Sequence, residues 1–258
     1  MRKSKTPLLA SFASATDFYT VPPIERRYVP MIRTVFLITY VGLAIAIVLP
    51  FFILYSWITG SPEAMYEMAM KTLRSGLRIV GVRVRVEGVE NIPDRTCIFA
   101  SNHVSNIDPV ALVPFIPRRV AILAKKQVFR IPILATGMRM CQIVPVDRDD
   151  KESAASSVNK AIQYLRSGTS FLVYPEGTRS PDGRLRAFKS GTFVMALEAR
   201  MPVVPVSLIG TQRLMPKGES SLRPGEVIVR FGPAVDSTDY KFERREVLRE
   251  RVHDLVEA

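Results

Sequence analysis

Hydrophobic and polar positions divide the chain into two parts with different patterns. Residues 35–58 read VFLITYVGLAIAIVLPFFILYSWI and carry no charged side chain. As a straight helix this run would be about 36 Å long, which is enough to cross the hydrocarbon core of a bilayer. The alternative is a buried core helix, in which so long a charge-free run is not expected. The pattern predicts a membrane-embedded helical segment in which Pro50 kinks or breaks the helix.

The next segment, residues 62–80, has an amphipathic pattern. Its apolar side chains recur at helical spacing, whereas its basic side chains fall elsewhere on the helix surface. Such a helix either lies in the membrane interface or packs on a globular domain, and the pattern fits both. We therefore assign residues 35–80 to a membrane-associated helical segment, preceded by a polar, basic tail over residues 1–34.

From residue 82 onward the pattern changes to short runs rich in Val and Ile. The runs are VRVRVEG, TCIFAS, VAILAK, CQIVPV, SFLVYP, VVPVSLIG and EVIVRFG. Helical patterns lie between several of them, notably at 152–167, 189–200 and 239–257. Strands that alternate with helices predict an α/β domain over residues 81–258, with a mixed, largely buried sheet flanked by helices.

Composition adds a constraint on partners. Hydrophobic residues make up 47% of the chain, and 36 Lys and Arg against 24 Asp and Glu give a net charge of +12. That excess suits nucleic acid, an anionic membrane surface or a phosphorylated substrate. Because no helix-turn-helix, RNA-recognition or zinc-finger pattern occurs, we expect no nucleic-acid partner. Cys97 and Cys141 lack the spacing of a disulfide framework or a zinc site.

Residues 101–110, SNHVSNIDPV, contain His103, one of two histidines in the chain. An apolar strand pattern ends just before this stretch, and Asp108-Pro109 is typical of a helix start. A turn between the strand and the helix would bring the Asp108 carboxylate against the imidazole, fixing its tautomer and making it a better base. Alternatively, Asp108 caps the helix and His103 lies in the loop by chance. The other histidine, His253, is expected on the surface of a terminal helix.

A second loop of chemical interest follows the strand SFLVYP. The loop contains Glu176, Gly177, Thr178 and Arg179. The glycine allows a ligand to approach the backbone, the threonine offers a hydroxyl, and the arginine offers a planar guanidinium suited to phosphate. Further cations follow other strands, namely Lys125, Lys126 and Arg148. Ligands of α/β sheets bind where such loops converge, so these residues describe an anion-binding site beside His103. A solvated basic loop is the alternative.

Together the motifs resemble a known family. N-H-x-x-x-x-D at 102–108 and E-G-T-R-S at 176–180, with AKKQVFRIP, IVPVDR, FKSGTFVMA and VVPVSLIGTQRLMPKG, resemble the 1-acyl-sn-glycerol-3-phosphate (lysophosphatidic acid) acyltransferases over roughly residues 80 to 235. The resemblance implies acyl transfer from a coenzyme A or acyl carrier protein thioester to the sn-2 hydroxyl of lysophosphatidic acid, which gives phosphatidic acid. No cofactor is implied apart from the thioester co-substrate.

The resemblance also implies roles for individual residues. His103 is the general base and Asp108 its partner. The motif from Glu176 to Arg179 binds the acceptor, with Arg179 on its phosphate, and Arg148 belongs to a further basic motif. Residues 204–206 match a motif near the acyl donor. We add Lys125 and Lys126 as candidate substrate-binding residues.

Two other functions stay open from the sequence, and so does the membrane topology. A lipid hydrolase would need a nucleophile such as Ser101 or Ser105, although neither lies in a G-x-S-x-G elbow. A family member acting on another lyso-acceptor is the second.

Because the thioester donors are cytosolic, we expect the catalytic domain to face the cytoplasm at the cell membrane. The basic residues before the apolar run disfavour translocation, which predicts a hairpin that enters one leaflet and turns at Pro50.

Overall fold

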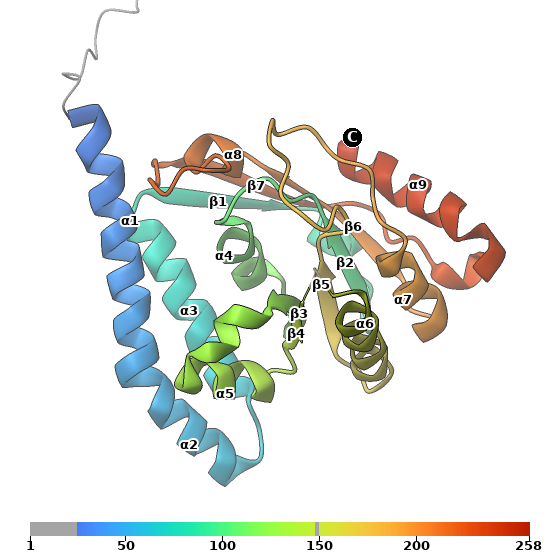
Figure 1. Cartoon of the computed structure of the whole chain (residues 1–258), viewed down its shortest axis with the longest axis horizontal. Helices are drawn as coiled ribbons and strands as arrows, with labels where there is room; N and C mark the ends of the chain where they lie inside the picture. The colour runs from blue at the N-terminus through green and yellow to red at the C-terminus, as the bar shows by residue number, and fades with distance from the viewer. Residues whose placement is uncertain (1–24, 148–149) are drawn as a thin grey trace, which may run out of the picture.

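The computed structural model describes residues 25–147 and 150–258 and consists of a long helical arm beside an α/β domain (Figure 1). Helix α1 (Glu25–Leu43) continues through a π-helical turn (Ala44–Val48) into α2 (Leu49–Thr59). The chain reverses at Gly60, which has a φ of 70°, and α3 (Glu63–Ile79) runs back alongside the arm. The long helix starts well before the charge-free run, and its first turns contain polar residues as well.

Of the kink or break predicted at Pro50, the break is wrong, since α2 continues to Thr59. The π-helical turn immediately before Pro50 accommodates the ring, which an undisturbed α-helix would not do without losing a hydrogen bond and meeting a carbonyl. The segment Val29–Thr59 is long and apolar enough to cross a membrane, and only 6% of its apolar window is buried. That exposure excludes a core helix of the domain.

A mixed seven-stranded sheet forms the domain, in the order β1-β7-β6-β2-β5-β3-β4. Its strands are β1 (Val82–Glu87), β2 (Ile98–Ser101), β3 (Val120–Lys125), β4 (Val144–Val146), β5 (Ser170–Val173), β6 (Val203–Ile209) and β7 (Gly225–Phe231). All neighbours pair in parallel except β6 and β7, which are antiparallel. The predicted fold class is confirmed, and the carboxyl ends of β2, β5, β3 and β4 meet at one edge of the sheet.

Helices cover both faces of the sheet (Figure 1). One face carries α3, α4 (Asp108–Leu112) and α5 (Pro132–Met140), and the other carries α6 (Lys151–Arg166), α7 (Gly191–Ala199) and α9 (Arg245–Glu257). The short α8 (Thr211–Leu214) follows β6, and 3-10 turns lie at Val89–Asn91, Val113–Phe115, Lys126–Arg130, Ser237–Asp239 and Phe242–Arg244. Every residue of β2 and β5 is buried, as expected for strands covered on both faces.

Helix α3 packs on the domain, which decides between the two interpretations of its amphipathic pattern. Met65, Tyr66 and Leu77 are buried in the core, and the Arg74 Nε donates to the Pro114 carbonyl at 2.6 Å. The free apolar surface instead lies on the arm, where Trp57 is 67% exposed and Ile58 77%. The long, exposed apolar helix of the described residues is therefore α1–α2 and not α3.

Candidate active site

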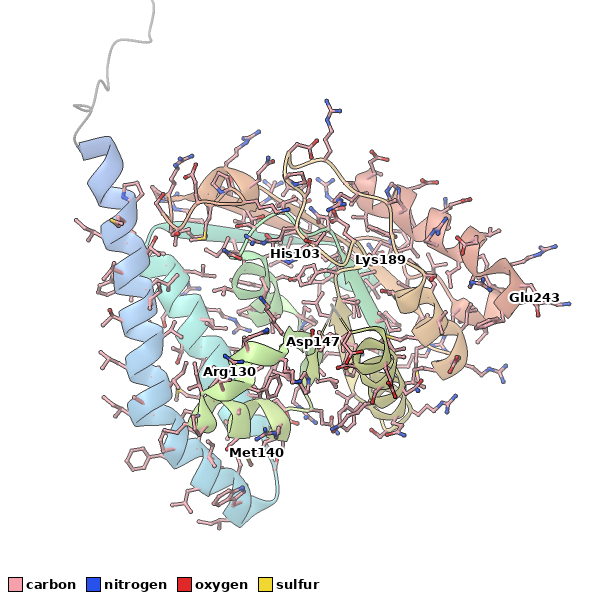
Figure 2. All side chains as sticks on the ribbon, in the orientation of Figure 1. His103, Arg130, Met140, Asp147, Lys189 and Glu243 are labelled. Atoms are coloured by element: carbon pink, nitrogen blue, oxygen red, sulfur yellow. The ribbon has the colours of Figure 1, made fainter. Side chains whose placement is uncertain are left out.

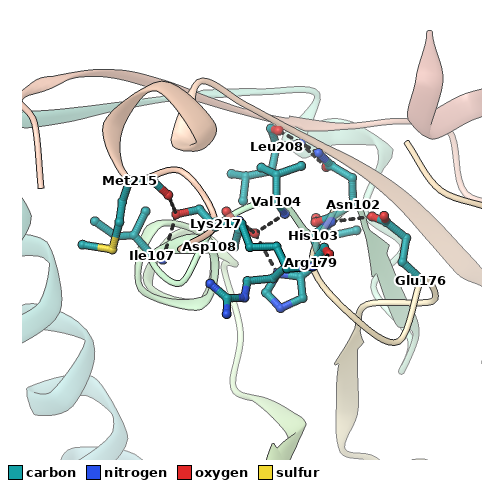
Figure 3. A network of polar contacts seen from close by, with 12 residues as sticks. Asn102, His103, Val104, Ile107, Asp108, Glu176, Arg179, Leu208, Met215 and Lys217 are labelled. Carbon is teal, nitrogen blue, oxygen red and sulfur yellow. Dashed lines mark hydrogen bonds and ion pairs between the residues drawn. The ribbon is translucent and has the colours of Figure 1, made fainter. Parts of the chain in front are cut away.

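His103 lies in the loop between β2 and α4, between the two helical layers (Figure 2). Its Nδ1 is 2.7 Å from the Asp108 Oδ2, and the same oxygen accepts the backbone N–H groups of Val104 at 2.7 Å and Ser105 at 2.8 Å (Figure 3). Asp108 is fully buried, whereas the His103 side chain is 12% exposed. The structure thus brings the predicted pair together through the predicted turn.

This geometry determines which ring nitrogen is available for chemistry. The carboxylate holds a proton on Nδ1, so Nε2 carries the lone pair and faces away from Asp108. A proton taken up at Nε2 gives an imidazolium, which the buried carboxylate stabilises. An imidazole held in this way by a carboxylate can act as a general base.

Tyr174, the residue after β5, stacks on the imidazole, with ring centroids 4.3 Å apart and an interplanar angle of 24°. Burial, and then the negative charge of Asp108, raise the pKa of Tyr174 well above its ordinary value, so its hydroxyl keeps its proton. Within the described residues, neither this hydroxyl nor the Asp108 Oδ1 has a hydrogen-bond partner. Sequence reasoning missed Tyr174, because an aromatic residue at the end of an apolar strand has the pattern of a core residue.

Glu176 joins the two predicted loops. It is 2% exposed; its Oε1 accepts the His103 backbone N–H at 2.6 Å and its Oε2 accepts that of Arg186 at 3.2 Å. In return the Ser180 N–H donates to the His103 carbonyl at 2.8 Å. Burial raises the pKa of Glu176, and the two backbone hydrogen bonds partly oppose that rise. Both carboxylate oxygens are thus engaged by backbone, so any effect of Glu176 on a substrate is indirect.

Arg179 places a guanidinium group at the site. Its side chain lies beside the His103 ring (Figure 3), and its Nη1 is sealed from solvent without a hydrogen-bond partner among the described residues. The turn that places it needs Gly177, whose φ is 73°, and a Cβ there would lie 3.0 Å from Lys189. The Lys217 Nζ donates to the Arg179 carbonyl at 2.8 Å. Lys189 and Lys217 thus lie against the loop that carries Arg179, and a phosphate beside the imidazole would satisfy the Arg179 guanidinium.

Asn102 and Ser105 brace the His103 loop, which the sequence did not reveal. The Asn102 Nδ2 donates to the Leu208 carbonyl at 2.9 Å, and the Leu208 N–H donates back to the Asn102 Oδ1 at 2.7 Å. The Ser105 Oγ donates to the Met215 carbonyl at 2.6 Å. Ser105 and Ser101 are both fully buried, and Ser101 bonds to the Asn102 carbonyl, so neither is placed to act as the nucleophile of a hydrolase.

The remaining candidates fall in different places. Lys125 ends β3 and Lys126 starts the following 3-10 turn, and both are exposed; Thr178 is exposed as well. Arg148 lies outside the described residues. His253 differs from expectation, because its side chain is only 25% exposed and its ring meets Phe188 edge-on at 4.9 Å between centroids. His253 lies on the inner face of α9, so its side chain points toward the core.

An apolar cavity of about 320 Å³ adjoins the His103–Asp108 pair. It begins at Pro109 and Val110, directly after Asp108, and is enclosed by the π-helical turn with α2, by α3 and by α5. Gly137 of α5 keeps it open toward Leu49, whose side chain would lie 3.3 Å from a Cβ at that glycine. A cavity with so apolar a lining suits an aliphatic chain.

Comparison with known proteins gives consistent similarities. The sequence model of the acyltransferase family matches residues 83–209. The chain is 37% identical over 147 residues to the chloroplastic 1-acyl-sn-glycerol-3-phosphate acyltransferase BAT2 of Brassica napus, covering 56% of this chain and 42% of that protein. It is 29% identical over 192 residues to the 1-acyl-sn-glycerol-3-phosphate acyltransferase of Borreliella burgdorferi, covering 74% of this chain and 77% of that protein.

A solved structure is similar over almost the whole chain. The crystal structure of the lysophosphatidic acid acyltransferase PlsC from Thermotoga maritima matches with a TM-score of 0.78 and 30% identity, covering 90% of this chain and 95% of that one. By contrast, the chain spans 42% of the length of the Brassica relative.

Proposed function

Because the chain belongs to the acyltransferase family, we propose that it transfers an acyl group from a thioester to the sn-2 hydroxyl of lysophosphatidic acid and so makes phosphatidic acid. The observation that carries this proposal is the His103–Asp108 pair beside the unpaired guanidinium nitrogen of Arg179. A substrate with both a hydroxyl and a phosphate needs a base for the hydroxyl and a cation for the phosphate, close to each other.

The proposed reaction uses one base and no covalent enzyme intermediate. His103 Nε2 removes the proton of the acceptor hydroxyl as its oxygen attacks the thioester carbonyl carbon, forming a C–O bond and a tetrahedral oxyanion. Collapse of that oxyanion breaks the C–S bond, and the leaving sulfur takes the proton from the imidazolium. Asp108 stabilises the imidazolium between the two steps. The products are the ester and the free thiol, and His103 is restored as a base.

The acceptor fits through its phosphate. In lysophosphatidic acid the sn-2 hydroxyl and the phosphate are attached to neighbouring carbons, so a phosphate bound by Arg179 leaves the hydroxyl close to His103. Lys189 and Lys217 add positive charge on the same side. The apolar cavity behind Asp108 would take an acyl chain. The donor is a coenzyme A or acyl carrier protein thioester, with no further cofactor.

The arm suggests how the enzyme meets its lipid. The exposed apolar side chains of α1–α2 would enter one leaflet, and the chain turns at Gly60 instead of Pro50. The sequence before the apolar run carries six Lys and Arg residues, which disfavours its translocation. We therefore place the N-terminus and the catalytic domain on the cytoplasmic side of the cell membrane, where lysolipid can reach His103 from the leaflet surface.

An acyl-transfer assay tests this function. Purified protein is supplied with a long-chain acyl-coenzyme A or acyl carrier protein and a panel of lyso-acceptors that differ in head group. We expect phosphatidic acid from lysophosphatidic acid, and a rate lower by about 10²–10⁴ with the His103→Ala variant. Release of free fatty acid without acylated lipid would instead indicate a hydrolase. A faster reaction with a lyso-acceptor that lacks the free phosphate would reassign the acceptor within the family.

A further inference from the structure

A second, basic pocket lies at the carboxyl ends of β3 and β4, apart from the His103–Asp108 pair. It has a volume of about 430 Å³ and is lined by Lys126, Gln127, Phe129, Arg130, Arg139, Pro145 and Asp147. The Arg139 guanidinium carbon lies 5.8 Å from the centroid of the Phe129 ring. Figure 2 shows Arg130 and Asp147 on the α5 side of His103. The pocket thus combines three cations with an aromatic ring and two groups that accept hydrogen bonds.

The position of this basic pocket in the sheet limits which phosphate can reach it. The strands run in the order β2-β5-β3-β4, and all four are parallel. At a spacing of about 4.8 Å between neighbours, the ends of β3 and β4 lie roughly 10–15 Å from the end of β2, which His103 follows. An acceptor whose sn-2 hydroxyl is at His103 has its phosphate only two carbon atoms away. That phosphate is therefore held near Arg179 and not in the basic pocket.

The thioester donors do carry phosphate at such a distance from their reacting carbon. In coenzyme A the pantetheine arm separates the sulfur from a diphosphate, a ribose 3′-phosphate and an adenine ring. In acyl carrier protein the same arm ends in a single phosphodiester attached to a protein, without a nucleobase. A membrane lipid head group also lacks a nucleobase. A nucleobase stacks on aromatic rings, and Phe129 supplies one, with the Arg139 guanidinium beside it.

We propose that the basic pocket binds the nucleotide end of a coenzyme A thioester, with Lys126, Arg130 and Arg139 on its phosphates and Phe129 against its adenine. The inference rests on the proposed function, because it identifies the donor for that reaction. The pantetheine arm then runs along the sheet edge past the end of β5, which brings the thioester to His103. The acceptor phosphate on Arg179 and the donor phosphates in the basic pocket occupy separate sites.

Two charge-removing variants test the proposal, Arg130→Gln and Arg139→Gln, with Arg251→Gln as the matched control. Arg251 is an exposed cation on α9, on the other face of the sheet. KM is measured for one acyl group carried either by coenzyme A or by pantetheine, which lacks the nucleotide. Each pocket variant should raise KM for the acyl-coenzyme A about tenfold, the usual effect of losing one charged hydrogen bond. KM for the acyl-pantetheine and for lysophosphatidic acid should stay unchanged, and the control should change none of them.

Other outcomes would overturn the proposal. An equal rise in KM for acyl-coenzyme A and acyl-pantetheine would show that the pocket does not read the nucleotide. A rise confined to lysophosphatidic acid would assign the pocket to the acceptor, and loss of sedimentation with phosphatidylglycerol vesicles at unchanged KM would assign it to membrane lipid. Calorimetric binding of free coenzyme A to wild type and variants needs no turnover. It therefore still tests the pocket if the wild-type protein transfers no acyl group and the proposed function fails.

Discussion

At the scale of single residues, the imidazole of His103 is the group on which the proposed chemistry depends. Replacing His103 with Ala should lower kcat/KM by about 10²–10⁴, the usual contribution of a positioned base. Asp108→Asn should retain an intermediate activity, because the ring stays in place while control of its tautomer is lost. Steady-state kinetics measure both effects, and circular dichroism with vesicle sedimentation verifies that fold and membrane binding persist. Near-normal turnover by the His103 variant would refute the mechanism.

Two substitutions of Tyr174 distinguish the contribution of its ring from that of its hydroxyl. Its ring supports His103, whereas its hydroxyl is buried without a partner among the described residues. Tyr174→Phe should therefore raise the free energy of unfolding by about 1 kcal/mol, since an unsatisfied buried group is removed, and should keep activity. Tyr174→Ala should lose the stack and lower kcat. Urea unfolding and kinetics measure these changes. A large loss of activity in the Phe variant would instead give the hydroxyl a direct role.

Arg179 should affect the acceptor more than the donor. Arg179→Ala removes a charged contact worth roughly 1.5–3 kcal/mol, so KM for lysophosphatidic acid should rise at least about tenfold while KM for the thioester changes little. Arg179→Lys should restore only part of this, because an ammonium lacks the planar fork of a guanidinium. Arg184→Ala, an exposed cation of the same loop, is the control. Equal increases in both KM values would contradict the assignment.

At the scale of elements, the loops after β2 and β5 behave as one unit because Glu176 connects them. Its pKa is raised above the ordinary 4.5 by burial, so the folded protein holds this proton more tightly than the unfolded chain does. The protonated Glu176 side chain therefore contributes to the free energy of unfolding in full below pH 4.5. This contribution is lost as the pH rises through the pKa of Glu176 in the folded protein. The unfolding free energy of wild type minus that of Glu176→Gln should decline across this range, because the other carboxylates titrate in both proteins. Parallel curves would place the titration elsewhere.

The sequence predicted these elements unevenly, for physical reasons. The period of the apolar runs located the strands, and the residues at their ends identified both loops and the His103–Asp108 contact. The π-helical turn before Pro50 could not be predicted, because the accommodation of a proline ring depends on local backbone geometry and not on hydropathy. Tyr174, Asn102 and the brace by Glu176 were missed, since their importance arises from partners far away in sequence. Sheet order was equally out of reach, because it depends on pairing between distant segments.

At the scale of the whole molecule, the arm and the domain lead to a testable topology. Cys97 and Cys141 are buried, so a cysteine introduced by Ala10→Cys would be the reactive thiol for a membrane-impermeant maleimide. We expect no labelling on intact cells and full labelling after permeabilisation, because both the N-terminus and the domain are placed in the cytoplasm. Lys160→Cys on the exposed face of α6 reports the position of the domain in the same experiment. Labelling of residue 10 from outside would show that the arm spans the membrane.

The position of β1 at the edge of the sheet has a consequence for biosynthesis. Its partner is β7, with Val82 opposite Gly225, so β1 leaves the ribosome long before the strand on which it will pair. Arg83 and Arg85 alternate with valines along β1, and such charges discourage an unpaired strand from joining the wrong neighbour. The apolar arm emerges even earlier, while there is no finished domain beside it. The nascent chain should therefore settle on the bilayer first and complete its sheet there, so that lipid protects the arm from aggregation during synthesis.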